Sequence, residues 1–174
     1  MTFRPKSISK KEKMLSLLSA VAAALLIIIS GIVNRFGALY QISAIILGVV
    51  SIEFYLKYVG SDYVYDADDD YFKVYKITGK KSICVSSLDY EMSLSHVVSK
   101  QEYEENKDKF PKTNFNVNLC KNLAPKEYSL YFFEFNGKKC MMKFEPDEVF
   151  TEYINNLISA AWEKAENEEN DNEY

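Results

Sequence analysis

Two long apolar runs occupy the first third of the chain. Residues 14–33 contain no charged side chain, and residues 36–56 contain one, Glu53. A helix of about 20 residues spans the roughly 30 Å hydrocarbon core of a bilayer, since each residue adds about 1.5 Å. Because only Asn34 and Arg35 separate the runs, the pattern predicts two antiparallel transmembrane helices. A cleaved signal peptide is the alternative for the first run, but its apolar region would be only roughly 7–15 residues long.

Basic side chains predict the orientation of this hairpin. The N-terminal segment, residues 1–13, carries five of them, whereas the link between the helices carries only Arg35. Cations in short loops are retained on the cytoplasmic side of a membrane. We therefore expect a multi-pass protein of the cell membrane with both termini in the cytoplasm. In that reducing compartment three cysteines would be free thiols: Cys84, Cys120 and Cys140.

From residue 57 onward the apolar positions follow the two-residue period of β-strands. Three β-favouring stretches separated by turn residues predict an opening antiparallel meander, at about 58–66, 71–78 and 82–90. Residues 99–113 are mostly charged or polar, and they predict a solvated loop or a short exposed helix. Residues 114–119 alternate asparagine with apolar side chains, which predicts a strand with one buried face.

The clearest local signal is the Asn-Gly dipeptide at 136–137, which lies between the apolar stretches 128–135 and 138–144. Asn-Gly is the preferred pair for a two-residue type I′ hairpin turn, and this turn fixes the register of the two strands. Phe133 then faces Cys140, on a side of the hairpin that we expect to point into the core.

A final amphipathic helix is predicted to begin near residue 147. Pro146 suits the first helical turn, and the acids that follow it suit the positive end of the helix dipole. Apolar side chains then recur on one broad face as far as Trp162, so we expect this face to pack on the sheet. Residues 163–174 carry six acids and one lysine, and they predict a disordered, solvated tail.

The short antiparallel strands, the Asn-Gly hairpin and a final helix entered through Phe-Glu-Pro-Asp at 144–147 resemble the pleckstrin-homology-like domains of small bacterial membrane proteins. In those proteins one or two membrane helices precede the domain. The resemblance covers residues 57–162 together with the hairpin. It implies an α+β fold in which a curved antiparallel PH-like sheet or barrel is capped by one C-terminal amphipathic helix. It also implies a membrane-tethered binding or scaffolding module, and it brings no enzymatic activity.

Charged side chains are distributed unevenly along the chain. The chain is 48% hydrophobic and its net charge is −4, which averages a basic N-terminal part and an acidic C-terminal part. Residues 1–56 carry six basic and two acidic side chains (+4), and residues 57–174 carry fifteen and twenty-three (−8). A domain of charge −8 is repelled by nucleic acid. It is also repelled by an anionic leaflet, apart from local basic spots at Lys80-Lys81 and Lys138-Lys139. The acidic 66–70 loop also stands where phosphoinositide-binding domains place lysine and arginine, so the sequence disfavours phosphoinositide headgroups as ligands.

Residue types that serve catalysis or metal binding are sparse. His96 is the only histidine and the six glycines are scattered singly, so neither histidine-based catalysis nor a phosphate-binding loop is predicted. Asp66, Asp68 and Asp70 match the start of a calcium-binding loop, but Tyr71 stands where that loop needs glycine. We expect an ordinary turn there. The sequence therefore predicts a non-enzymatic protein without a catalytic residue, cofactor or metal site.

Two sets of residues are candidates for interaction. Ala44 and Gly48 have a spacing of small residues that lets a second helix approach closely. Two basic spots stand out on the acidic domain, at Lys80, Lys81, Lys138 and Lys139. The leading hypothesis is a membrane-anchored binding or scaffolding module with a protein partner. The alternative is a structural or accessory subunit of a membrane complex, a homo-oligomer included, that assembles through its two transmembrane helices.

Overall fold

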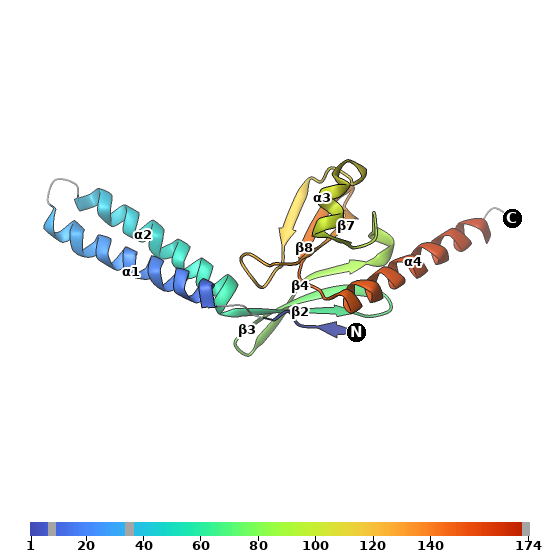
Figure 1. Ribbon diagram of the computed structural model, residues 1–174, viewed down its shortest axis with the longest axis horizontal. Coiled ribbons are helices and arrows are strands. Elements are labelled where there is room, and N and C mark those ends of the chain that lie inside the picture. Colours follow the sequence, from blue (N-terminus) through green and yellow to red (C-terminus); the bar gives the residue numbers. More distant parts are fainter. Residues whose placement is uncertain (7–9, 34–36, 172–174) are drawn as a thin grey trace. The chain divides into compact units, whose positions relative to one another are not determined.

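The computed structural model describes residues 1–6, 10–33 and 37–171, and the chain divides into two units (Figure 1). One unit, Ser7–Asp62, is a helical hairpin. The other combines Met1–Lys6 with Tyr63–Tyr174 and is rich in β-strands. The N-terminal six residues therefore belong to the β-rich unit, although the whole hairpin separates them from it along the chain.

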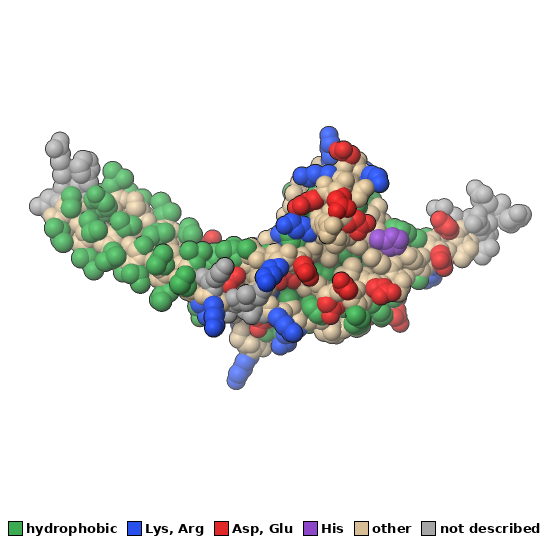
Figure 2. All heavy atoms as spheres, in the orientation of Figure 1, with side chains coloured by type: hydrophobic (Ala, Val, Ile, Leu, Met, Phe, Trp, Pro, Cys, Tyr) green, Lys and Arg blue, Asp and Glu red, His purple; other side chains and the backbone are tan. Residues whose placement is uncertain are grey.

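The hairpin consists of α1 (Lys10–Ile32) and α2 (Gly37–Phe54), and α2 continues into a π-helical turn, η1 (Tyr55–Val59). Two stretches are long and apolar enough to cross a membrane, Glu12–Ile32 and Gly37–Val59. Only 17% of the first and 11% of the second is buried, whereas a core helix of a soluble protein would be mostly buried. Hydrophobic side chains accordingly cover the surface of the hairpin in Figure 2. Two helices of membrane-spanning length are thus confirmed, while their orientation stays a prediction, and its Arg35 lies outside the described residues.

Small side chains let α1 and α2 approach closely. They recur at seven-residue intervals: Ser16, Ala23 and Ser30 on α1, and Gly37, Ala44 and Ser51 on α2. At one end the Ser51 hydroxyl donates to the Ser16 carbonyl oxygen at 3.1 Å. At the other end a Cβ on Gly37 would lie 3.0 Å from the Ser30 carbonyl oxygen. A seven-residue repeat of small residues keeps one seam of each helix against its partner, and the hydroxyls find acceptors without water.

The first sheet contains β1 (Thr2–Phe3), β2 (Ser61–Ala67), β3 (Tyr71–Thr78) and β4 (Lys81–Asp89), in that spatial order. β2, β3 and β4 are the predicted meander, although the first of these strands begins later than expected because η1 prolongs the helix. β1 was not predicted. It pairs antiparallel with β2, so that Phe3 lies opposite Tyr65.

The second sheet contains β5 (Val98–Ser99), β7 (Ser129–Phe135), β8 (Lys138–Phe144) and β6 (Phe115–Asn118), in that spatial order. The predicted hairpin register is confirmed, since Phe133 pairs with Cys140, and the turn has positive φ at Asn136 (51°) and Gly137 (70°). β6 runs parallel to β8.

Three short helical segments lie between β4 and β6: η2 (Tyr90–Met92), α3 (Lys100–Glu105) and η3 (Lys107–Lys109). The short exposed helix predicted within 99–113 is therefore present. It also covers part of the second sheet, because Tyr103 and Phe110 lie 5.8 and 5.3 Å from Phe132, measured between ring centroids. Both faces of β7 are consequently buried along most of its length.

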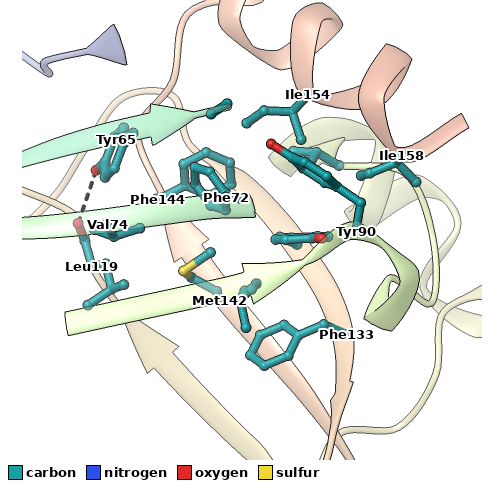
Figure 3. Close-up of a cluster of buried hydrophobic side chains, with 14 of the residues drawn as sticks. Tyr65, Phe72, Val74, Tyr90, Leu119, Phe133, Met142, Phe144, Ile154 and Ile158 are labelled. Atoms are coloured by element: carbon teal, nitrogen blue, oxygen red, sulfur yellow. Dashed lines mark hydrogen bonds between the residues drawn. The ribbon is translucent and has the colours of Figure 1, made fainter. Parts of the chain in front are cut away.

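One core lies between the inner faces of the two sheets and α4 (Glu148–Asp171), as Figure 3 shows. The helix contributes Phe150, Ile154 and Ile158, each fully buried. Asp147 caps its start, because the carboxylate accepts a hydrogen bond from the Phe150 amide at 2.8 Å. The helix passes Trp162 and continues to Asp171, through the first part of the segment predicted to be a disordered tail. No glycine or proline interrupts that segment, so nothing ends the helix where its apolar face ends.

The expected closed barrel is wrong, because the two sheets stay separate. β1 and β4 form the edges of the first sheet, and β5 and β6 form those of the second. Among the described residues no strand of one sheet pairs with a strand of the other. After β4, η2 turns the chain out of the first sheet, and an isolated bridge joins Ser93 to Phe133. The observed architecture is an α-hairpin followed by two facing sheets and a C-terminal helix.

Tyr65 connects every layer of the β-rich unit. Its hydroxyl donates to the Leu119 carbonyl oxygen at 3.0 Å and accepts from the Glu145 amide at 3.2 Å. Its ring meets Phe144 edge-on at 5.3 Å and stacks on Phe3 of β1 at 6.2 Å, between centroids. The side chain is fully buried, and burial raises the pKa of its phenol.

We expect Tyr65→Phe to lower the free energy of unfolding by about 2 kcal/mol, because the buried Glu145 amide loses its acceptor. Urea titration of the full chain in detergent micelles measures this, with the single tryptophan, Trp162, as the fluorescent probe. Tyr71→Phe is the matched control, since the Tyr71 side chain is 42% exposed. Equal losses of stability in the two variants would contradict the role given to the Tyr65 hydroxyl.

Candidate interaction surface

Apolar side chains are exposed at the free edge of the second sheet. Phe115 and Val117 of β6 are 54% and 43% exposed, so the predicted buried face of this strand is wrong except at Leu119. Phe115 pairs with Cys140 and Val117 with Met142, both of which point into the core. Paired residues share a face of a sheet. The two side chains therefore lie on the inner face, at an edge that the first sheet does not cover.

Phe135 at the end of β7 extends this surface. It is 51% exposed and shares the face of Phe133 by strand alternation. We call Phe115, Val117 and Phe135 the open-edge patch. Lys138 pairs with Phe135 in the hairpin, and its ammonium lies 5.2 Å from the centroid of the Phe115 ring. The patch thus joins β6, β7 and β8 and carries one cation directly on it.

The Asn-Gly hairpin also holds the start of β6 in place. The Asn114 amide donates to the Lys139 carbonyl oxygen at 2.7 Å, and the Lys139 amide donates to the Asn114 side-chain oxygen at 3.2 Å. Of the predicted basic pair, Lys138 therefore borders the patch, whereas the Lys139 side chain lies on the other face of the sheet by strand alternation. The other predicted pair, Lys80 and Lys81, lies on the β3–β4 turn of the first sheet, so the four lysines form two basic turns on two different sheets.

Of the two candidate helix-packing residues, only Ala44 is used within the hairpin. It is 2% exposed, in the seam between α1 and α2. A Cβ on Gly48 would meet nothing within 4 Å, so the α2 surface around Gly48 is open in this chain.

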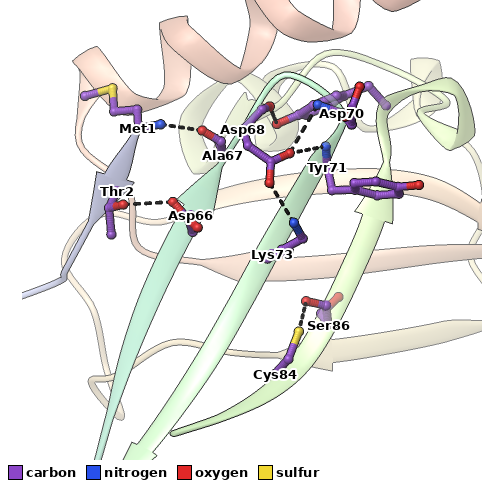
Figure 4. Close-up of polar contacts among 11 residues, drawn as sticks. Met1, Thr2, Asp66, Ala67, Asp68, Asp70, Tyr71, Lys73, Cys84 and Ser86 are labelled. Atoms are coloured by element: carbon purple, nitrogen blue, oxygen red, sulfur yellow. Dashed lines mark hydrogen bonds and ion pairs between the residues drawn. The ribbon is translucent and has the colours of Figure 1, made fainter.

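The Asp66–Asp70 turn uses its carboxylates to fix the chain (Figure 4). Asp68 accepts hydrogen bonds from the amides of Asp70 and Tyr71, at 3.1 and 2.6 Å. It also pairs with the Lys73 ammonium at 2.6 Å, which is the main reason that the pKa of the Asp68 carboxyl is lowered. Asp66 accepts from the Thr2 hydroxyl at 2.8 Å and so helps to hold β1. The turn is a structural one, and no group of metal-binding side chains is found among the described residues.

Other side chains of types that serve catalysis or binding also make structural contacts. His96 Nε2 lies 2.9 Å from the Ser159 hydroxyl, and the ring packs on Trp162 at 5.0 Å. An open groove of about 1170 Å³ lies between α3 and the start of α4. Its wall includes Lys100, which pairs with Glu104 at 3.9 Å, and Asp147, which caps α4. All three cysteines are free thiols, with Cys84 exposed and the other two buried.

A buried carboxylate, Glu145, joins three distant parts of the β-rich unit. Its two oxygens accept from the amide and the side-chain nitrogen of Asn122, at 2.7 and 2.6 Å. The same Asn122 nitrogen donates to the Lys6 carbonyl oxygen at 3.0 Å, which ties down the N-terminal segment. Burial raises the pKa of Glu145, and the bonds from Asn122 offset part of that rise. Nothing in the local sequence distinguishes Glu145 from the exposed acids around it.

We expect the stability of the protein to respond to the protonation of Glu145. Because its pKa is higher in the folded state than in the unfolded chain, folding favours the protonated form, and stability is lost as pH rises through the folded pKa. Relative to Glu145→Gln, the wild type should therefore gain free energy of unfolding when pH is lowered from about 8 to about 5. Urea titrations of both proteins at the two pH values measure this difference. A difference that stays constant, or that changes with the opposite sign, would refute it.

Comparisons with protein-family models, with curated proteins and with solved structures find no match to the chain. No family is identified.

Proposed function

We propose that the chain is a membrane-anchored, non-enzymatic binding module whose open-edge patch takes an extended segment of a protein partner. The observation that carries this proposal is the exposure of inner-face side chains on β6, since apolar groups of that face are otherwise buried in the core. An edge strand also offers unpaired backbone groups to an added strand. The lysine beside the patch, Lys138, favours a segment that contains acidic as well as apolar side chains.

The module that we propose is anchored in the cell membrane and lies in the cytoplasm. The two apolar helices support anchorage in the cell membrane, and the basic residues before α1 support a cytoplasmic β-rich unit. An opening meander, an Asn-Gly hairpin and a C-terminal helix, in this order, support the relationship to pleckstrin-homology-like domains.

Site-specific photocrosslinking in native membranes tests the patch. A photoreactive phenylalanine analogue at position 115 should yield a covalent adduct with a partner protein, and the same analogue at Tyr71 should not. Adding Val117→Asp should reduce the adduct more than about tenfold, because a charge then enters the apolar contact. Positions 71, 115 and 117 are all exposed, so these changes leave the core unaltered. Recovery of the chain alone, or equal adducts from positions 115 and 71, would count against the proposal.

The second candidate function is that of a subunit that assembles through its helices, and the open surface at Gly48 favours it. In that case Gly48→Leu should weaken self-association of the full chain by about tenfold, since a large side chain blocks close helix approach. Subunit-exchange energy transfer in lipid nanodiscs measures the association. Gly31→Leu on α1 is the matched control, because a Cβ there also meets nothing within 4 Å. If Gly48→Leu associates as the wild type does, this candidate is excluded.

A further inference from the structure

Charges are segregated along the first sheet. Because β2, β3 and β4 are consecutive antiparallel strands, the start of β2, the end of β3 and the start of β4 lie at one end of the sheet. Basic side chains gather there or follow β1 towards it: Arg4, Lys6, Lys76, Lys80 and Lys81. We call this the basic end, where the acid on β2 is Asp62.

The opposite end of the sheet is acidic. It contains the β2–β3 turn and the end of β4, with six acids: Asp66, Asp68, Asp69, Asp70, Asp89 and Glu91. Four of these acids line a hollow of about 340 Å³ against α4, together with Lys164. The pairing of Asp68 with Lys73 neutralises one further acid. On the face visible in Figure 2, lysines and arginines gather near the β3–β4 turn and also around α3, and acids lie between these places and along α4.

The chain enters and leaves the helical hairpin from the basic end. Only Gly60 separates Val59, the last residue of the second candidate span, from Ser61, the first residue of β2. On the other side, β1 ends at Phe3 and α1 begins at Lys10, and β1 runs towards the start of β2 because the two strands are antiparallel. If α1 and α2 span a bilayer, the chain therefore enters β2 shortly after it leaves the second span.

Exposed apolar side chains accompany the lysines of the β3–β4 turn. Ile83 is 60% exposed and Val85 is 43% exposed, on β4 directly after Lys81. Basic residues with neighbouring apolar side chains suit the boundary between anionic headgroups and acyl chains.

We propose that the β3–β4 turn, through Lys80, Lys81 and Ile83, docks on the anionic leaflet beside the two spans, with the acidic end of the sheet directed away from it. The inference rests on the proposed membrane anchorage and adds a lipid-contacting surface to it. The contact is with the charge of the leaflet and needs no pocket for one headgroup. The β-rich unit would thereby be held in one orientation, and its acidic end would face the aqueous side.

Fluorescence quenching in nanodiscs tests this docking on the full chain. Cys84 lies on β4 three residues after Lys81 and is the exposed thiol, whereas Cys120 and Cys140 are buried, so it accepts a nitrobenzoxadiazole label selectively. Lipids with a nitroxide on the headgroup quench a fluorophore that touches the leaflet. We expect the label on Cys84 to be quenched more strongly in discs of phosphatidylcholine that contain about 30% phosphatidylglycerol than in discs of pure phosphatidylcholine.

Charge reversal supplies the matched variants. Each lysine near an anionic surface favours contact roughly fivefold, so K80E/K81E should reduce the contact equilibrium more than about twentyfold and remove the effect of phosphatidylglycerol. K138E/K139E makes the same charge change on the other sheet and should leave the quenching unchanged.

The outcomes separate the docking from the anchorage. Failure of the chain to co-elute with discs of either composition would overturn the anchorage and the docking with it. Co-elution without dependence on phosphatidylglycerol, or equal effects of the two double variants, would overturn the docking alone.

Discussion

The hydroxyl of Tyr65 is the contact on which the β-rich unit depends. Two facing sheets that do not close into a barrel lack a continuous hydrogen-bond ladder between them. Tyr65 supplies a direct link, because it projects from the first sheet and bonds backbone groups that follow β6 and β8 in the second. Its ring, meanwhile, lies between Phe3 and Phe144. One buried side chain therefore fixes both the separation of the sheets and the position of the N-terminal strand.

The placement of β1 constrains the rest of the molecule. Since β1 and β2 are hydrogen-bonded neighbours, the chain before α1 and the chain after α2 meet in the same sheet. Two helices between these points have to run out and back, and an antiparallel hairpin with a seam of small residues satisfies this requirement. The Asn122 bond to Lys6 and the Thr2 bond to Asp66 reinforce the same closure. The chain before α1 and the chain after α2 are thereby held in one sheet.

Features that depend on local sequence were predicted well. The apolar runs gave the two long helices, and Asn136-Gly137 set the hairpin register because a two-residue turn leaves no choice of pairing. β1 was missed because a two-residue strand has no periodicity, and its pairing depends on residues more than sixty positions away. The sequence indicated the lysines of the candidate surface, but it did not predict the exposure of Phe115. It follows from the order of strands in the second sheet, which leaves β6 at an uncovered edge.

The effect of net charge on function also depends on how the fold arranges residues that are distant in the sequence. A sum of −8 for residues 57–174 predicts repulsion from an anionic leaflet only if the charges are spread evenly. β2 has seven residues, and at roughly 3.3 Å per residue the two ends of the sheet are about 20 Å apart. The Debye length at physiological ionic strength is about 8 Å, so a leaflet near one end is largely screened from charges at the other. What the leaflet meets is then the local charge of the basic end, which strand pairing creates and which no sum over the sequence reveals.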